Sequence, residues 1–172
     1  MYILVTLNLK YRYQHKERRI FILKIELNKP IQEVAKACGY KRTTLIMKLV
    51  EPESRFYSSD LAILSKNRYL KDSEWIDFFP DAPSNLPEGN PVLRAGSWKR
   101  FTLITGIPKS SFIEKWKMKS PSGQFREFKV SELQKMSAAN LITKQEIQNY
   151  MEQSYSMKRI LVVWINPSDK QK

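Results

Sequence analysis

The pattern of apolar and polar residues predicts strands near both ends of the chain. Residues 2–9 and 20–27 are rich in Ile, Leu, Val, Phe and Tyr, and odd-numbered apolar positions in the second run flank the polar residues Lys24 and Glu26. A third apolar run occupies 159–165. Alternation of this kind, with aromatic and β-branched residues, is typical of half-buried strands. We expect three strands here, which can pair into one small sheet.

Between these runs, the apolar residues recur at helical spacing. A helix is predicted after Pro30, a residue that the first turn of a helix tolerates. Its apolar positions are Ile31, Val34, Ala35 and Cys38. Further helices are predicted after residue 41, from Ser59, from about Ser73 to Phe78, and at the corresponding places in the second half of the chain, ending with 144–152. The expected fold class is mainly α with small β elements (α+β).

The helical region consists of two similar copies. Aligning Gly39 with Gly106, an offset of 67 positions, pairs apolar with apolar and hydroxyl with hydroxyl residues. Further on, Phe56 pairs with Phe128 and residues 59–61 pair with 131–133 at an offset of 72. The difference between the two offsets is one insertion near residues 120–124, where Pro, Gly and Ser predict a turn. Two registers joined by a single gap indicate an internal duplication.

A proline-rich, acidic stretch separates the two copies. We divide the chain into an N-terminal β-hairpin-like segment (1–27), a first unit (28–78), a linker (79–95), a second unit (96–153), and a C-terminal strand and tail (154–172). Proline cannot continue a helix or sit in a central strand, so residues 79–91 are predicted to be an ordered linker. A long surface loop of one domain is the alternative.

The charge of the chain points to a polyanionic partner. The 172 residues include 30 Lys and Arg against 17 Asp and Glu, so the net charge is +13. Most of the excess lies in the two predicted units, and the linker is acidic. A balance of this kind is typical of proteins that bind nucleic acid.

The order of residues 34–45 gives this charge a possible use. An apolar residue and a small one are followed by two variable positions, an apolar residue, Gly39, an apolar residue and a polar helix start. This order resembles the helix-turn-helix family of DNA-binding proteins, and the tandem pair resembles small phage-type transcriptional regulators with winged helix-turn-helix units. Ala35 would let the two helices cross closely, and Gly39 can adopt the left-handed conformation that ends the first helix.

The two copies depart from this family in several places. Lys48 and Lys115 stand where the family usually has an apolar residue, Thr102 replaces the small residue at the helix crossing, and Pro108 directly follows the second turn. The second copy therefore matches the family less well than the first.

The resemblance implies that the second helix of each copy enters the major groove of DNA. Hydroxyl and basic side chains on its outer face, and arginines in a following strand or wing, suit phosphates and base edges. The predicted DNA-binding residues are Lys41, Arg42, Thr43, Thr44, Lys48, Arg55, Lys109, Ser110, Ser111, Lys115, Lys117 and Arg126. For Arg55 and Arg126, the alternative is that the neighbouring aromatics belong to the core and the arginines are only solvated.

Other chemistry finds little support in the sequence. One Cys excludes a disulfide framework within the chain, and one His with one Cys excludes the common zinc sites. His15 has no obvious catalytic partner, Cys38 falls on an apolar helix face, and Asp77 and Asp81 are interpreted as solvated charges. We therefore expect no enzymatic activity, no cofactor and no metal.

Two further expectations concern location. No apolar run approaches the about 20 residues that cross a bilayer, so no membrane partner is expected. The first residues do not resemble a signal peptide. The expected location is cytoplasmic, at the nucleoid or, for a viral protein, in the host cell.

The leading hypothesis is therefore sequence-selective binding of double-stranded DNA by a transcriptional regulator of a phage or mobile element. The expected partner is duplex DNA, and a second copy of the chain or RNA polymerase is a further candidate. One alternative is a non-enzymatic structural or packaging component that uses the helix pairs for protein contacts. Another is an RNA-binding module with Tyr11, Arg12 and Tyr13 on its surface.

Overall fold

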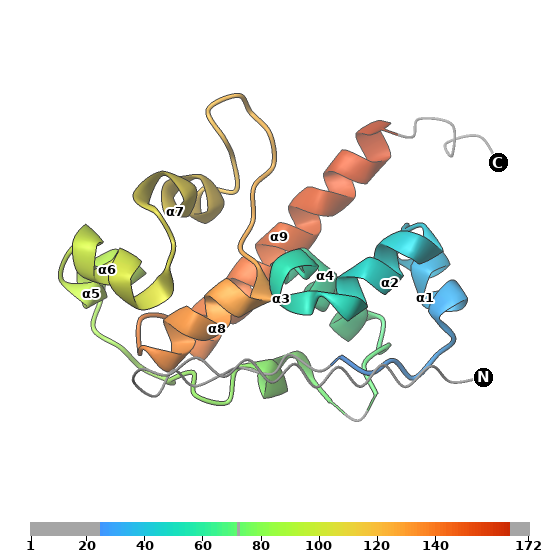
Figure 1. Cartoon of the computed structure of the whole chain (residues 1–172), viewed down its shortest axis with the longest axis horizontal. Coiled ribbons are helices and arrows are strands. Elements are labelled where there is room, and N and C mark those ends of the chain that lie inside the picture. The colour runs from blue at the N-terminus through green and yellow to red at the C-terminus, as the bar shows by residue number, and fades with distance from the viewer. Residues whose placement is uncertain (1–24, 72, 166–172) are drawn as a thin grey trace.

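The chain folds mainly into helices, as the computed structural model of residues 25–71 and 73–165 shows (Figure 1). The first copy contains α1 (Ile31–Ala37), α2 (Arg42–Val50), α3 (Pro52–Arg55), α4 (Ser58–Lys66) and the 3-10 helix η1 (Trp75–Phe78). The short helix α5 (Pro91–Ala95) precedes the second copy, which contains α6 (Trp98–Thr105), α7 (Lys109–Trp116), α8 (Val130–Ala138) and α9 (Lys144–Ile165). The predicted mainly helical class is confirmed.

The corresponding helices α4 and α8 of the two copies begin in the same way. Asp60 and Glu132 are the acidic residues in the first turns of these helices. The carboxylate of Asp60 accepts a hydrogen bond from the backbone amide of Tyr57, and that of Glu132 accepts one from the amide of Lys129, both at 2.9 Å. These bonds satisfy amides that have no partner within the helix. The offset of 72 residues is therefore visible in the hydrogen bonding.

The same two helices also end alike. Arg68 follows α4 and Asn140 follows α8, and each has a φ of 55°. The insertion that distinguishes the copies is a turn, as predicted. Lys119 and Phe125 pair across it in an isolated antiparallel bridge, and Gly123 inside it has a φ of 81°.

The two copies meet through equivalent backbone segments. Tyr57 and Lys129, which the offset of 72 aligns, form an isolated antiparallel bridge. Its hydrogen bonds run from the amide of Ser58 to the carbonyl of Phe128 and from the amide of Val130 to the carbonyl of Phe56, both at 3.0 Å. Because each bond is the counterpart of the other, a local two-fold axis relates the two copies at this contact.

One continuous cluster of buried side chains joins both copies. Equivalent buried positions are Val34 and Phe101, Leu45 and Phe112, Phe56 and Phe128, and Leu61 and Leu133. The second copy therefore uses aromatic rings at two positions where the first uses aliphatic side chains. Trp75, Trp98 and Trp116 pack partly buried against this cluster. The side chain of Trp164 lies outside the described residues.

The linker packs onto the body of the protein. Ala82 and Val92 are buried in the common core. The guanidinium of Arg94 in α5 donates to both carboxylate oxygens of Glu146 in α9, at 2.7 and 3.0 Å, and to the carbonyl of Leu141 at 3.0 Å. The stretch is thus ordered, as predicted, but α5 shows that its last residues are helical.

The predicted sheet is not found in the part of the chain that the structure describes. The run 2–9 and residues up to 24 lie outside it. At the end of the run 20–27, Leu27 forms an isolated antiparallel bridge with Leu70. The β pairing within residues 25–71 and 73–165 consists of isolated bridges.

The prediction of a C-terminal strand at 159–165 is wrong, because α9 continues to Ile165. The helix expected to end at residue 152 packs along α4 and extends through the apolar run (Figure 1). Extending an existing helix requires no new nucleation, and this advantage outweighs the preference of Val and Ile for strands. None of the helices within the described ranges, α9 included, is both long enough and apolar enough to cross a membrane.

Candidate nucleic-acid interface

Each copy contains two helices joined by a short turn with a left-handed glycine. Gly39 after α1 has a φ of 71°, and Gly106 after α6 has a φ of 72°. After α1, the amides of Gly39 and Tyr40 donate to the carbonyls of Lys36 and Ala35, which is a Schellman cap. After α6, the amide of Gly106 makes the single bond of the αL cap, to Thr102. The predicted equivalence of the two glycines is confirmed.

The residues by which only the second copy departs from the helix-turn-helix pattern lie at its turn, and side-chain hydrogen bonds stabilise that turn. The hydroxyl of Thr102 donates to the carbonyl of Ile107 at 3.1 Å, and the amide of Ile107 donates to the hydroxyl of Thr105, also at 3.1 Å. Pro108 stands directly before α7, in an extended conformation. These side-chain bonds take the place of the second backbone bond that caps α1.

Replacing Gly106 with alanine should lower the free energy of unfolding by about 1 kcal/mol, because a Cβ disfavours the left-handed conformation. No heavy atom within 4 Å would collide with the new Cβ, so the cost is conformational. Urea denaturation measures it. Ser110→Ala, at an exposed helical position of α7, is the control and should change stability little. Unchanged stability of Gly106→Ala would contradict this reading of the turn.

The beginnings of α2 and α7 face solvent. Of the predicted DNA-binding residues, Lys41, Arg42, Thr43, Thr44, Lys109, Ser110 and Lys117 are exposed and Ser111 is half-buried. Within residues 25–71 and 73–165, no carboxylate forms an ion pair with Lys41, Arg42, Lys109 or Lys117. The ammonium of Lys109 lies 5.4 Å from the centre of the Trp98 ring. We call Lys41–Thr44 and Lys109–Ser111 the helix-start surfaces.

Lys48 and Lys115 do not lie on this outer face, where the sequence placed them. Lys48 is 2.7 Å from a carboxylate oxygen of Asp60, and Lys115 is 2.6 Å from one of Glu132. Their side chains are only 13% and 17% exposed. Helical spacing predicts which way each lysine side chain points on an isolated helix. It does not reveal the acid that each lysine pairs with, because that acid comes 12 or 17 residues later in the chain. We therefore remove both from the candidate interface.

Arg55 and Arg126 are exposed but pair with acids. Arg55 ends the short helix α3, where a strand or wing was one prediction, and donates to Glu51 at 2.8 Å. Arg126 lies 3.8 Å from Glu114. Both acids are themselves partly exposed, and ion pairs of this kind contribute little to stability. Neither arginine is held on a continuous strand.

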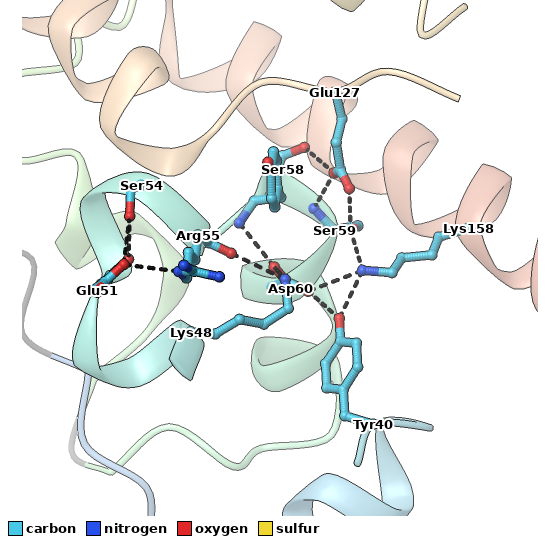
Figure 2. A network of polar contacts seen from close by, with 11 residues as sticks. Tyr40, Lys48, Glu51, Ser54, Arg55, Ser58, Ser59, Asp60, Glu127 and Lys158 are labelled. Carbon is cyan, nitrogen blue, oxygen red and sulfur yellow. Dashed lines mark hydrogen bonds and ion pairs between the residues drawn. The ribbon is translucent and has the colours of Figure 1, made fainter. Parts of the chain in front are cut away.

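A buried carboxylate, Asp60, organises a polar network in the first copy (Figure 2). It accepts hydrogen bonds from Lys48, from Lys158 of α9 at 2.9 Å, and from the hydroxyl of Tyr40. Lys158 also donates to Tyr40 at 2.7 Å and to Ser59 at 3.0 Å. Burial raises the pKa of Asp60, but the two ammonium groups and these hydrogen bonds outweigh it and lower the pKa overall.

A second buried carboxylate, Glu127, extends this network from the other copy (Figure 2). It accepts hydrogen bonds from the hydroxyls of Ser58 and Ser59, at 2.8 and 2.7 Å, and from the amide of Ser59 at 2.8 Å. Burial raises its pKa more than Lys158 and these bonds lower it. The network therefore joins α4, α9 and the segment before α8, and its role is to fix the two copies together.

These network residues could have been found partly from the sequence. Lys48 and Lys115 recur at the first offset, and Asp60 and Glu132 recur at the second, so each copy carries a lysine and an acid in matching places. A basic and an acidic residue that recur together in both copies indicate an ion pair, and this pattern could have been recognised in the sequence. Lys158 and Glu127 have no such repeat, and only the packing of α9 and the bridge between the copies brings them to Asp60.

The described residues that were considered as catalytic or metal-binding candidates, Cys38 and Asp77, have structural roles. Cys38 is half-buried, and burial, with the nearby Asp60, raises its pKa to about 11, so its reactive thiolate is scarce at neutral pH. Asp77 accepts a hydrogen bond from the amide of Glu74 and caps η1. His15 and the segment 11–13 lie outside the described residues.

Comparison with family models, curated proteins and solved structures found no match to this chain.

Proposed function

We propose that the chain binds double-stranded DNA through its two helix-turn-helix units. The observation that carries the proposal is the pair of helix-start surfaces. Each follows a left-handed glycine turn and is largely exposed. The first presents Lys41 and Arg42 and the second presents Lys109, all without a carboxylate partner among the described residues. Free cations next to hydroxyl groups at the beginning of an exposed helix suit phosphates and base edges.

The geometry between the copies supports binding to two successive sites. At Tyr57 and Lys129 the two copies meet in a local two-fold contact, the kind of contact through which symmetric dimers form. Dimers of helix-turn-helix proteins place their recognition helices in major grooves roughly 34 Å apart. A single chain of this kind would bind two adjoining half-sites, and the use that we propose is transcriptional control.

The two half-sites should differ in how strongly they are read. The surface of α2 offers the guanidinium of Arg42, which suits guanine, and the methyl and hydroxyl groups of Thr43 and Thr44. The surface of α7 offers Lys109 and two serines, which suit phosphates better than particular bases. Most of the sequence preference would then lie in the half-site under α2.

Charge reversal at the first helix-start surface tests the proposal. Lys41→Glu with Arg42→Glu should weaken binding to duplex DNA by about 100-fold near 0.1 M salt, because attraction to phosphate is replaced by repulsion. Lys135→Glu with Lys144→Glu is the matched control. It makes the same change in net charge at exposed positions of α8 and α9 and should have a much smaller effect.

Mobility shift of a random-sequence duplex pool measures both effects, and circular dichroism checks that each variant is folded. Equal affinity of the two double variants would show that only the total charge matters, and would refute the assignment of the interface. Preference for single-stranded over duplex nucleic acid would favour the RNA-binding alternative instead.

A further inference from the structure

The outward face of α6 carries two apolar side chains that remain exposed among the described residues. Leu103 is 83% exposed and Ile104 is 40% exposed, whereas Phe101 and Thr105 on the other side of this helix are buried. Leu93 in α5, the neighbouring helix at the same end of the molecule, is 68% exposed (Figure 1). Exposed apolar side chains that gather in one place mark a site of interaction more often than isolated ones do.

The first copy shows that this position does not require apolar residues. At the offset of 67, Leu103 and Ile104 correspond to Lys36 and Ala37 of α1, and both of those are exposed. The same place in the same helix pair therefore accepts a lysine and an alanine. The apolar pair in α6 is not explained by packing among the residues that the structure describes.

Two cations border the apolar pair. Lys99 and Arg100 precede Leu103 and Ile104 by four residues, so the four side chains share one face of α6. Lys99 and Arg100 are exposed, and no carboxylate in the described ranges forms an ion pair with them. At the equivalent places α1 has Gln32 and Glu33, so the cations too are specific to the second copy.

We infer that this α6 face (Lys99, Arg100, Leu103 and Ile104) binds an acidic, amphipathic segment of another protein. Such a segment would cover the two apolar side chains with its own and place carboxylates beside the two cations, as helices do in apolar grooves. This interaction goes beyond the proposed DNA binding and does not depend on it.

The charges distinguish this partner from the other possible occupants. A second copy bound symmetrically would set the same cations against each other, because a two-fold contact uses one patch on both subunits. Duplex DNA would satisfy the cations but would leave the most exposed apolar side chain of the face, Leu103, against phosphate and water. An acidic amphipathic protein segment satisfies both the charges and the apolar pair.

The test uses two synthetic helical peptides of about 15 residues, a length at which isolated helices begin to form. Both have a leucine face; one carries glutamates beside it, and the other has lysine in place of each glutamate. Fluorescence anisotropy with the full chain should show at least about tenfold tighter binding of the glutamate peptide. Equal affinity of the chain for the two peptides would refute the inference.

Two variants of the full chain identify the face. Leu103→Lys with Ile104→Ala copies the residues of α1 and should weaken binding of the glutamate peptide by about tenfold, although the added lysine increases the attractive charge. Lys99→Glu with Arg100→Glu should reverse the preference in favour of the lysine peptide. Duplex binding by the first variant should be unchanged, which separates this test from that of the proposed function.

The other occupants give different results, and each would overturn the inference. A dimer of the wild-type chain that becomes monomeric in Leu103→Lys/Ile104→Ala, measured by sedimentation, would assign the face to a second copy. Wild-type binding to vesicles of anionic phospholipid that the same variant loses would assign it to a membrane surface. Retention of full peptide affinity by that variant would place the binding elsewhere.

Discussion

Asp60→Asn is expected to lower the free energy of unfolding by about 3–5 kcal/mol, the usual result of removing one partner from a buried ion pair. Asp60 is 1% exposed, and the lysines 48 and 158 both point their ammonium groups at it. Asparagine keeps the shape but leaves two partly buried cations without their common anion. Urea denaturation at neutral pH measures the loss.

Glu132→Gln is the matched control, because the internal repeat provides it. Glu132 pairs with one lysine instead of two, and its carboxylate is 15% exposed, against 1% for that of Asp60. Its loss should be smaller, about 1–2 kcal/mol, since water screens part of the interaction. If the two variants lost the same small amount, the idea that Asp60 anchors α9 to the first copy would be wrong.

Asp60→Asn should also change how the free energy of unfolding depends on pH. The pKa of Asp60 is lowered in the folded chain, so its contribution to stability is present above its unfolded pKa and is lost as the pH falls through the folded value. Glu127 has the opposite sign, because a raised pKa favours its protonated form in the folded state. Asp60→Asn should therefore lose less stability between neutral and acidic pH than the wild type does.

The second large effect is expected at Phe128. Its side chain is fully buried, and its ring packs against Phe112 and Tyr150, with centroids 5.7 and 5.2 Å away. Phe128→Ala should cost about 3–5 kcal/mol, through lost burial and the cavity left behind. Phe125→Ala, at a half-buried site in the inserted turn, is the control and should cost clearly less. Denaturation curves of the two variants with equal midpoints would contradict this assignment of the core.

The helix pairs and the duplication were predictable from the sequence because they depend on local signals. The glycines 39 and 106 set the turns, and the apolar residues at helical spacing set the buried faces, without reference to the rest of the chain. The acids at the beginning of α4 and α8 act within three residues of their partners. Signals of such short range are readable without a structure.

The predictions that were wrong concern features that depend on contacts between distant parts of the chain. The apolar run at 159–165 has the composition of a strand, but the helix that precedes it packs along α4 and carries it into the same helix. Lys48 looked like a surface cation because its partner, Asp60, belongs to another helix. Direction on an isolated helix could be predicted, whereas the neighbour that covers it could not.

The reciprocal pairing of Tyr57 with Lys129 bears on how such a chain can arise. A contact that obeys a two-fold axis can already form between two identical, separate chains. Joining their genes head to tail needs only a connecting peptide, and afterwards each half is free to change by itself. The aromatic rings in one half and the aliphatic side chains in the other, and the apolar face on α6 alone, are differences that a pair of identical subunits could never acquire.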